Sequence, residues 1–116
     1  MKVLVVSDDE QIRNEAEFGF PTGVEISTAS DSREASLRMK TEVPNVLIVD
    51  IRTGSAGGFG LLRDMSQRAT QHGIPVLMLV ERAQDEWLAR QAGASRVRIQ
   101  PIESSELVAE TLSLIS

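Results

Sequence analysis

Val46-Leu47-Ile48-Val49-Asp50 is the segment of this 116-residue chain that says most about its architecture. Four consecutive apolar residues, rich in β-branched side chains, predict a strand buried on both faces, as in a parallel sheet. Two similar apolar runs occupy residues 3–6 and 76–80. Residues 24–27 and 97–100 alternate apolar and polar side chains instead, which is typical of half-exposed edge strands. The sequence therefore predicts three buried strands flanked by two edge strands.

Helical patterns separate the predicted strands. The helices are expected at about residues 9–18, from Asp31 through Met39, from Leu61 to His72-Gly73, at about residues 84–92, and from Ser104 or Ser105 to Ile115. Asp31 and Glu34 have the spacing of a capping box. Because strand and helix alternate five times, we expect one α/β domain over residues 1–116. It should be a doubly wound parallel sheet with helices on both faces and right-handed crossovers.

Composition excludes several classes of function. The chain has no cysteine, which excludes disulfides, thiolate catalysis and cysteine-rich zinc sites. His72 is the only histidine, so multi-histidine metal sites are excluded and a catalytic triad is disfavoured. A net charge of −5, the lack of a basic run and 3% aromatic residues argue against direct nucleic-acid binding. No apolar stretch approaches the roughly 20 residues that span a bilayer, so we expect no membrane segment and a cytoplasmic location.

Polar residues follow two of the predicted buried strands. Ser7, Asp8 and Asp9 come after the first, and Asp50 comes after residues 46–49. In an open doubly wound sheet, ligands bind beyond the carboxyl ends of the strands, where strand order reverses. If these two strands are neighbours, Asp8 and Asp50 lie side by side and repel each other unless a cation or a proton intervenes. Carboxylates with room for water suit Mg²⁺, and a carboxylate beside Mg²⁺ can attack a phosphoryl group.

Structural explanations exist for each of these features. Asp8 or Asp9 can cap the first helix, and Asp50 can form a local Asx turn. The Gly-rich segment 54–60 fits neither the dinucleotide fingerprint nor the P-loop, so we interpret it as a loop beside the site. His72 is expected to be a surface residue at a helix end, and Trp87 to pack over the core of the domain.

Together, these segments resemble the receiver domain of bacterial response regulators. The resemblance covers essentially the whole chain and is carried by residues 3–10, 46–50, 58–62, 75–79 and 92–94. It implies a flavodoxin-like (βα)5 fold with strand order 2-1-3-4-5. It also implies that Asp50 accepts a phosphoryl group from a histidine kinase or phosphotransfer protein. Mg²⁺ would be held by Asp8, Asp50 and the backbone carbonyl of Arg52. The Gln100-Pro101 peptide bond is expected to be cis.

Several positions depart from the family pattern. The family usually has an acid at the position of Ser7, Thr or Ser at Val80, an aromatic residue at Val97 and lysine at Gln100. Gln100 offers a neutral hydrogen bond where a lysine would offset the charge of a phosphoryl group. Val80 offers no donor, and Val97 cannot make the usual aromatic rotamer change. Arg82 or Arg98 is a conceivable replacement cation, because Arg supplies charge-assisted donors.

These departures favour an atypical receiver domain that signals by protein–protein contact with a degraded phosphorylation switch, and not an enzyme. Expected partners are a histidine kinase, a phosphotransfer protein or a downstream signalling protein. A homodimer is also conceivable through the fourth helix, fifth strand and fifth helix, a surface that would include Trp87, Arg90, Arg98 and Glu106. One alternative is a working phosphoacceptor that shuttles phosphate through Asp50. A small phosphotransferase with an Asp50 nucleophile is disfavoured, because residue 52 is Arg and no cap domain excludes water.

Overall fold

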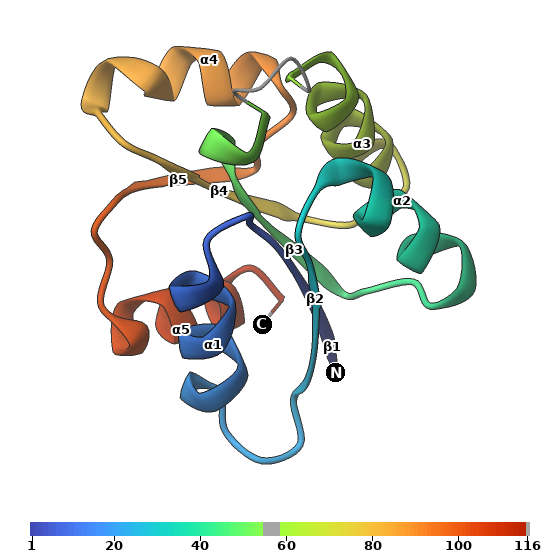
Figure 1. Ribbon diagram of the computed structural model, residues 1–116, viewed down its shortest axis with the longest axis vertical. Helices are drawn as coiled ribbons and strands as arrows, with labels where there is room; N and C mark the ends of the chain where they lie inside the picture. The colour runs from blue at the N-terminus through green and yellow to red at the C-terminus, as the bar shows by residue number, and fades with distance from the viewer. Residues whose placement is uncertain (55–58, 116) are drawn as a thin grey trace.

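The computed structural model describes residues 1–54 and 59–115 (Figure 1). In chain order its elements are β1 (Lys2–Val6), α1 (Glu10–Gly19), β2 (Glu25–Ala29), α2 (Ser32–Thr41), β3 (Val46–Asp50), the 3-10 turn η1 (Ile51–Gly54), α3 (Phe59–Gln71), β4 (Val76–Val80), the 3-10 turn η2 (Ala83–Asp85), α4 (Glu86–Gln91), β5 (Arg96–Ile99) and α5 (Ser104–Ser113). The described strands form one parallel sheet of order β2-β1-β3-β4-β5, which confirms the predicted fold class. Most of the predicted Gly-rich loop, residues 55–58, lies outside the described residues.

The sheet is sandwiched between two helical layers. Figure 1 shows α1 and α5 together on one side of the sheet and α2, α3 and α4 on the other. Because successive strand residues point to opposite faces, each central strand contributes to both cores. In β3, Val46 and Ile48 pack in the core under α1 and α5, whereas Leu47 and Val49 pack in the core under the other three helices. The central strands are fully buried, as their continuous apolar sequences predict.

Aspartate side chains cap the first two helices. Asp9 accepts a hydrogen bond from the backbone N–H of Gln11 at 2.9 Å, so Asp9 rather than Asp8 begins α1. Asp31 accepts from the backbone N–H of Glu34 at 2.8 Å, which confirms the predicted N-cap of α2. The Glu34 carboxylate accepts in turn from the hydroxyl of Ser30, and this hydrogen bond lowers the pKa of Glu34. Both caps satisfy N–H groups that would otherwise lack partners at a helix start.

The prediction that Trp87 packs over the core is wrong. Its side chain is 70% exposed on α4. Ala89, two residues later, is fully buried and faces the sheet. Since each helical residue advances about 100°, a residue two positions away points almost to the opposite side. By contrast, His72 lies on the surface at the end of α3, as expected, and its ring hydrogen-bonds with the carbonyl of Arg68 at 2.8 Å.

The α4–β5 connection requires glycine at position 93. Gly93 has φ +99°, and a Cβ atom there would lie 3.1 Å from the backbone nitrogen of Gln67 in α3. Gly73 also has a positive φ, +79°, but a Cβ atom at Gly73 would have no neighbouring atom within 4 Å. We expect Gly73→Ala to lower the free energy of unfolding by about 1 kcal/mol through backbone strain alone. Gly93→Ala should cost about 3 kcal/mol, because α4 must also move away from α3. Urea denaturation of both variants measures the difference, and equal losses would show that the close approach to Gln67 is unimportant.

Candidate functional site

The site is built where β1 and β3 end side by side. Val6 pairs with Val49 in the register of the two strands, so the residues that follow them meet at the same edge of the sheet. Ser7 and Asp50 are both buried there, and the Ser7 hydroxyl donates a hydrogen bond to Oδ2 of Asp50 at 2.9 Å. The two predicted acidic segments therefore converge, as the topological switch point requires. It is the serine of the first segment that contacts Asp50.

The Asp50 carboxylate accepts hydrogen bonds on both oxygens. Oδ1 accepts from the backbone N–H of Arg52 at 3.0 Å, from its Nε at 3.1 Å and from Nε2 of Gln100 at 3.2 Å. Oδ2 accepts from Nη2 of Arg52 at 3.0 Å, in addition to the hydroxyl of Ser7. One guanidinium thus binds both carboxylate oxygens, the bidentate geometry that makes Arg–carboxylate pairs strong. The acid in this pocket is already neutralised by a side chain of the protein.

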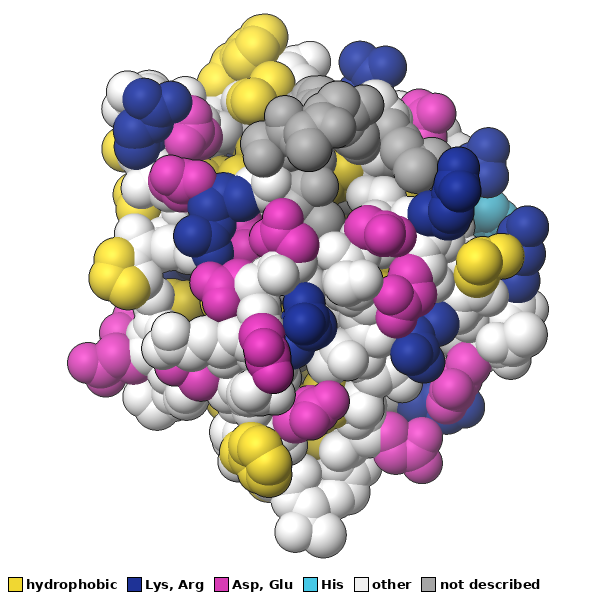
Figure 2. All heavy atoms as spheres, in the orientation of Figure 1, with side chains coloured by type: hydrophobic (Ala, Val, Ile, Leu, Met, Phe, Trp, Pro, Cys, Tyr) yellow, Lys and Arg dark blue, Asp and Glu magenta, His cyan; other side chains and the backbone are white. Residues whose placement is uncertain are grey.

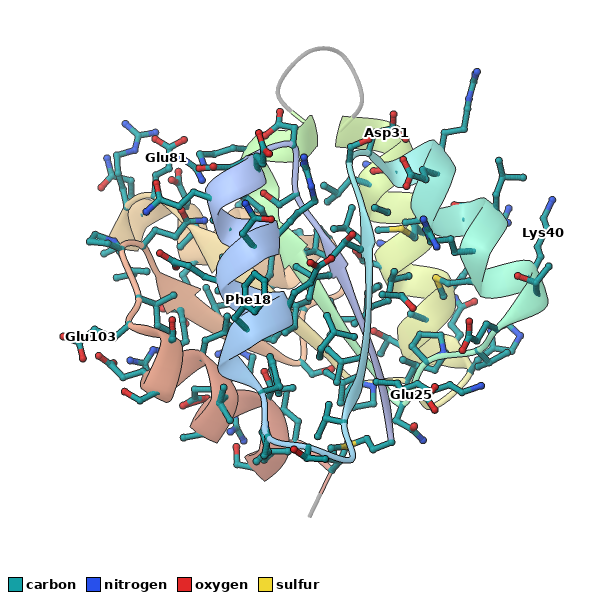
Figure 3. All side chains as sticks on the ribbon, turned by 60° about the horizontal axis from the view of Figure 1, so that its bottom comes forward. Phe18, Glu25, Asp31, Lys40, Glu81 and Glu103 are labelled. Atoms are coloured by element: carbon teal, nitrogen blue, oxygen red, sulfur yellow. The ribbon has the colours of Figure 1, made fainter. Side chains whose placement is uncertain are left out.

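The same guanidinium also lies close to two neighbouring acids, Asp9 and Glu81. Nη2 of Arg52 lies 3.4 Å from Oδ2 of Asp9, and its Nε lies 3.9 Å from Oε1 of Glu81. Glu81 follows β4 and lies at the same end of the molecule as Asp31 (Figure 3). Hydrogen bonding to Asp50 raises the pKa of Arg52, and the charges of the three acids act in the same direction. Arg52 is therefore the central cation of an acidic pocket built from β1, β3 and β4.

Sequence reasoning missed the side chain of Arg52, since it gave a role only to the backbone carbonyl. The available signal was an arginine two residues after a buried aspartate in a chain without a lysine at position 100. The cations considered as replacements are not at Asp50. Arg82 pairs with Asp85 at 3.3 Å, and Arg98 pairs with Glu106 at 2.6 Å and with Glu110 at 3.1 Å.

The three positions that depart from the expected pattern in β4, in β5 and just after β5 are Val80, Val97 and Gln100, and Gln100 contacts Asp50. Val80 ends β4, is fully buried and has no polar atom to offer. Val97 in β5 is half-buried against the core of β4 and α4. Gln100 reaches Asp50 with a neutral amide donor, and the Gln100-Pro101 peptide bond is cis. Val80 and Gln100 thus supply no charged donor at their positions, and the charged donor that contacts Asp50 is the side chain of Arg52.

The donor set, as arranged here, does not fit Mg²⁺. Both oxygens of Asp50 are engaged, and a guanidinium already carries the positive charge between Asp50 and Asp9. Asp8 is exposed. Within residues 1–54 and 59–115, no cluster of three or more His, Cys, Asp or Glu side chains could hold a metal ion. The predicted metal site of Asp8, Asp50 and the backbone carbonyl of Arg52 has two acidic side chains and stays a prediction. A metal ion there would require the Arg52 side chain to move away from Asp50.

Comparisons with known proteins point to one family. The family profile of the response regulator receiver domain matches residues 3–111. The phosphate regulon transcriptional regulatory protein PhoB of Rhizobium meliloti (strain 1021) is 26% identical, and the transcriptional regulatory protein PrrA of Mycobacterium leprae (strain TN) is 34% identical. Both alignments cover 98% of this chain but 52% and 49% of those proteins. The chain therefore spans about half the length of these regulators.

Solved structures show the same likeness. The chemotaxis response regulator CheY4 of Vibrio cholerae superposes with a TM-score of 0.82 at 25% identity, over 97% of both chains. The receiver domain of Francisella response regulator 1452 shares the fold with a TM-score of 0.81, over 98% of this chain and 95% of that one. The fold agrees with these solved structures, and the family profile covers most of the chain. This chain therefore belongs to the response regulator receiver domain family.

Proposed function

We propose that this domain is an atypical receiver in which Arg52 holds Asp50 in an internal ion pair, and which signals through protein contacts. Receiver domains are the signalling domains of two-component systems, and they interact with histidine kinases or phosphotransfer proteins. The single observation that carries the proposal is the bidentate contact of Arg52 with Asp50, at 3.1 and 3.0 Å. The hydrogen bonds from Ser7 and Gln100 also hold the Asp50 carboxylate in this position.

Phosphorylation would need this contact to open. An attacking carboxylate oxygen needs a free lone pair directed at the phosphorus atom, and both oxygens of Asp50 accept hydrogen bonds from the Arg52 guanidinium. Charge-assisted hydrogen bonds contribute about 2 kcal/mol each, less here because Arg52 is one-third exposed. Opening the pair by itself therefore reduces the reactive population by roughly one to two orders of magnitude. Receiver domains typically bind Mg²⁺ at an acidic pocket, and here Arg52 occupies the corresponding charge position.

A phosphoryl group on Asp50 would also contact few side chains that could change conformation in response. A ligand shifts a conformational equilibrium only through contacts that differ between the two states. Val80 lacks a hydroxyl that could follow the phosphoryl group, and Val97 lacks a ring that could change rotamer. The positions that usually transmit the change are apolar here, so we expect little coupling from Asp50 to α4 and β5.

Amide chemical shifts measured with Mg²⁺ and beryllofluoride test the proposal. Beryllofluoride mimics a phosphoryl group on aspartate, so a working switch would respond throughout its output surface. We expect shifts to stay small across residues 84–100 at saturating additions, and to match those of Asp50→Asn, which cannot take the mimic. Large shifts that spread through residues 84–100 and vanish in Asp50→Asn would contradict the proposal.

A phosphate shuttle is the second candidate, favoured by the position of Asp50 at the end of β3 beside β1. A shuttle needs chemistry at Asp50 but no conformational output. A phosphorylated species in intact-mass spectra after incubation with acetyl phosphate, absent in Asp50→Asn and without spreading amide shifts, would favour the shuttle over the first candidate. An enzyme is a weaker candidate still, since receiver domains generally act as signalling domains.

The face formed by α4, β5 and α5 is the proposed contact for a partner. Trp87 and Ile99 are exposed there, at 70% and 47%. The charged residues of this face are paired within the chain, because Arg98 holds Glu106 and Glu110. The exposed Trp87 side chain is therefore available to a partner or a second copy, whereas the surrounding charges are already paired within the chain. This arrangement favours contact through apolar surface. In the described part of the chain, no helix has the length and apolar character needed to cross a membrane.

A further inference from the structure

Cations gather on two helices of an otherwise acidic chain. The helices α2 and α3 carry Arg33, Arg38, Lys40, Arg63 and Arg68 against two acids, Glu34 and Asp64, while the chain as a whole has a net charge of −5. Figure 2 shows dark blue side chains along the edge of the molecule formed by these helices, around the cyan histidine. This separation of charge produces a local field that attracts acidic partners.

The same helices enclose an apolar groove. Its volume is about 430 Å³, and it lies between α2 and α3 at the end where those helices finish. Met65, Ala69 and Ile74 form its floor and are 8% exposed or less. Met39 lines one wall, and Val43 stands at the edge with 65% of its surface exposed. Methionine side chains adapt to different apolar shapes, so this groove suits a bulky side chain supplied by another molecule.

Unpaired cations border the groove. Lys40 and Arg68 both line it, and neither forms a salt bridge with any other described residue. Lys40 extends away from the end of α2 (Figure 3). By contrast, Arg38 on the same helix is paired with Glu34 at 3.4 Å. Of the four cations on these helices that form no salt bridge with another described residue, Lys40 and Arg68 therefore line the groove, and Arg33 and Arg63 do not.

We propose that the α2–α3 groove binds an acidic segment of a partner protein, with one bulky apolar side chain seated on Met39, Met65 and Ile74. Carboxylates on either side of that anchor would meet Lys40 and Arg68. This combination of an apolar floor and charged edges fits an amphipathic helix, which presents an anchor and flanking charges on one face. A phosphate backbone fits less well, because it offers no apolar group for the floor.

The groove is separate from the Asp50 pocket. Val43 and Ile74 precede β3 and β4, so the groove opens at the amino-terminal end of the strands, whereas Asp50 lies at the carboxyl-terminal end. Binding in the groove should therefore be unaffected by Asp50→Asn. The proposal stands or fails independently of the role of Arg52.

Fluorescence anisotropy with a defined peptide tests the groove. The probe is a fluorescein-labelled peptide of roughly 12 residues, rich in glutamate, with two leucines spaced four apart so that either of them can supply the single anchor. We expect the full chain to bind it in about 150 mM salt with a dissociation constant below about 200 μM. Lys40→Glu and Arg68→Glu should each weaken binding at least roughly fivefold, since each reversal turns attraction into repulsion. Replacing the two leucines of the peptide with alanine should remove measurable binding.

Arg63→Glu is the matched control. Arg63 lies on α3, as Arg68 does, but outside the groove, so the same change of net charge should alter binding less than about twofold. Equal weakening by Arg63→Glu would show attraction by overall charge and overturn the proposal. No binding at about 1 mM peptide would also overturn it. Tighter binding of a single-stranded oligonucleotide than of the peptide would assign the surface to nucleic acid instead. Circular dichroism shows whether each variant is folded.

Discussion

Arg52→Ala should raise the affinity of this domain for Mg²⁺ by at least roughly fiftyfold. Removing the guanidinium takes a charged donor from each oxygen of Asp50 and removes the cation that contacts both Asp9 and Asp50. Two uncompensated carboxylates repel each other and favour a divalent ion. We expect a dissociation constant of about 1 mM for the variant and above roughly 50 mM for the wild type. At about 10 mM MgCl2, the free energy of unfolding then rises by about 1.4 kcal/mol in the variant and by about 0.1 kcal/mol in the wild type.

Urea denaturation with MgCl2 or EDTA measures this difference. Arg13→Ala is the matched control, because Arg13 donates to the backbone carbonyl of Ser7 at 2.6 Å and its loss leaves the Arg52 guanidinium on Asp50. The control should respond to Mg²⁺ as weakly as the wild type does. A millimolar dissociation constant in the wild type would show that Arg52 does not compete with the metal, and would remove the basis of the proposed function.

The second large effect is energetic coupling between Asp50 and Arg52. In EDTA, Arg52→Ala should lower the free energy of unfolding by about 3 kcal/mol, because a fully buried carboxylate loses its charged partner. Asp50→Ala should cost about 2 kcal/mol, since the partly exposed guanidinium can turn to water and to Asp9. The double variant should lose about 3 kcal/mol, so that the coupling energy is about 2 kcal/mol.

A double-mutant cycle in urea gives the coupling directly. Losses that add to within about 0.5 kcal/mol would mean that the pair contributes nothing to the folded state. The same cycle between Asp50 and Arg13 should be additive to that margin, because Arg13 contacts the backbone of Ser7 and not the carboxylate of Asp50. The two cycles together separate a specific ion pair from a general change in charge near the site.

Much of the fold was predictable because its signals are local. Continuous apolar runs predict central strands wherever they occur, since a strand covered by helices on both faces must be apolar at every position. Asp31 and Glu34 predict the start of α2 from a spacing of three residues. The expectation for Trp87 failed because composition alone does not say which side of a short helix faces the sheet. Buried Ala89 determines that side in α4.

For the site, local patterns placed Asp50 at the end of a buried strand, and this conclusion follows from periodicity within that segment. Its position beside the end of β1 depended on the two strands being neighbours, an order that only the resemblance to receiver domains implied. Only the folded structure shows the direction of the Arg52 side chain. It also shows that α2 and α3 together form the apolar α2–α3 groove with cations at its border. A long, flexible side chain takes the direction of the nearest opposite charges, and here those charges come from Asp9, Asp50 and Glu81, which are far apart in the chain and meet only after the strands have paired.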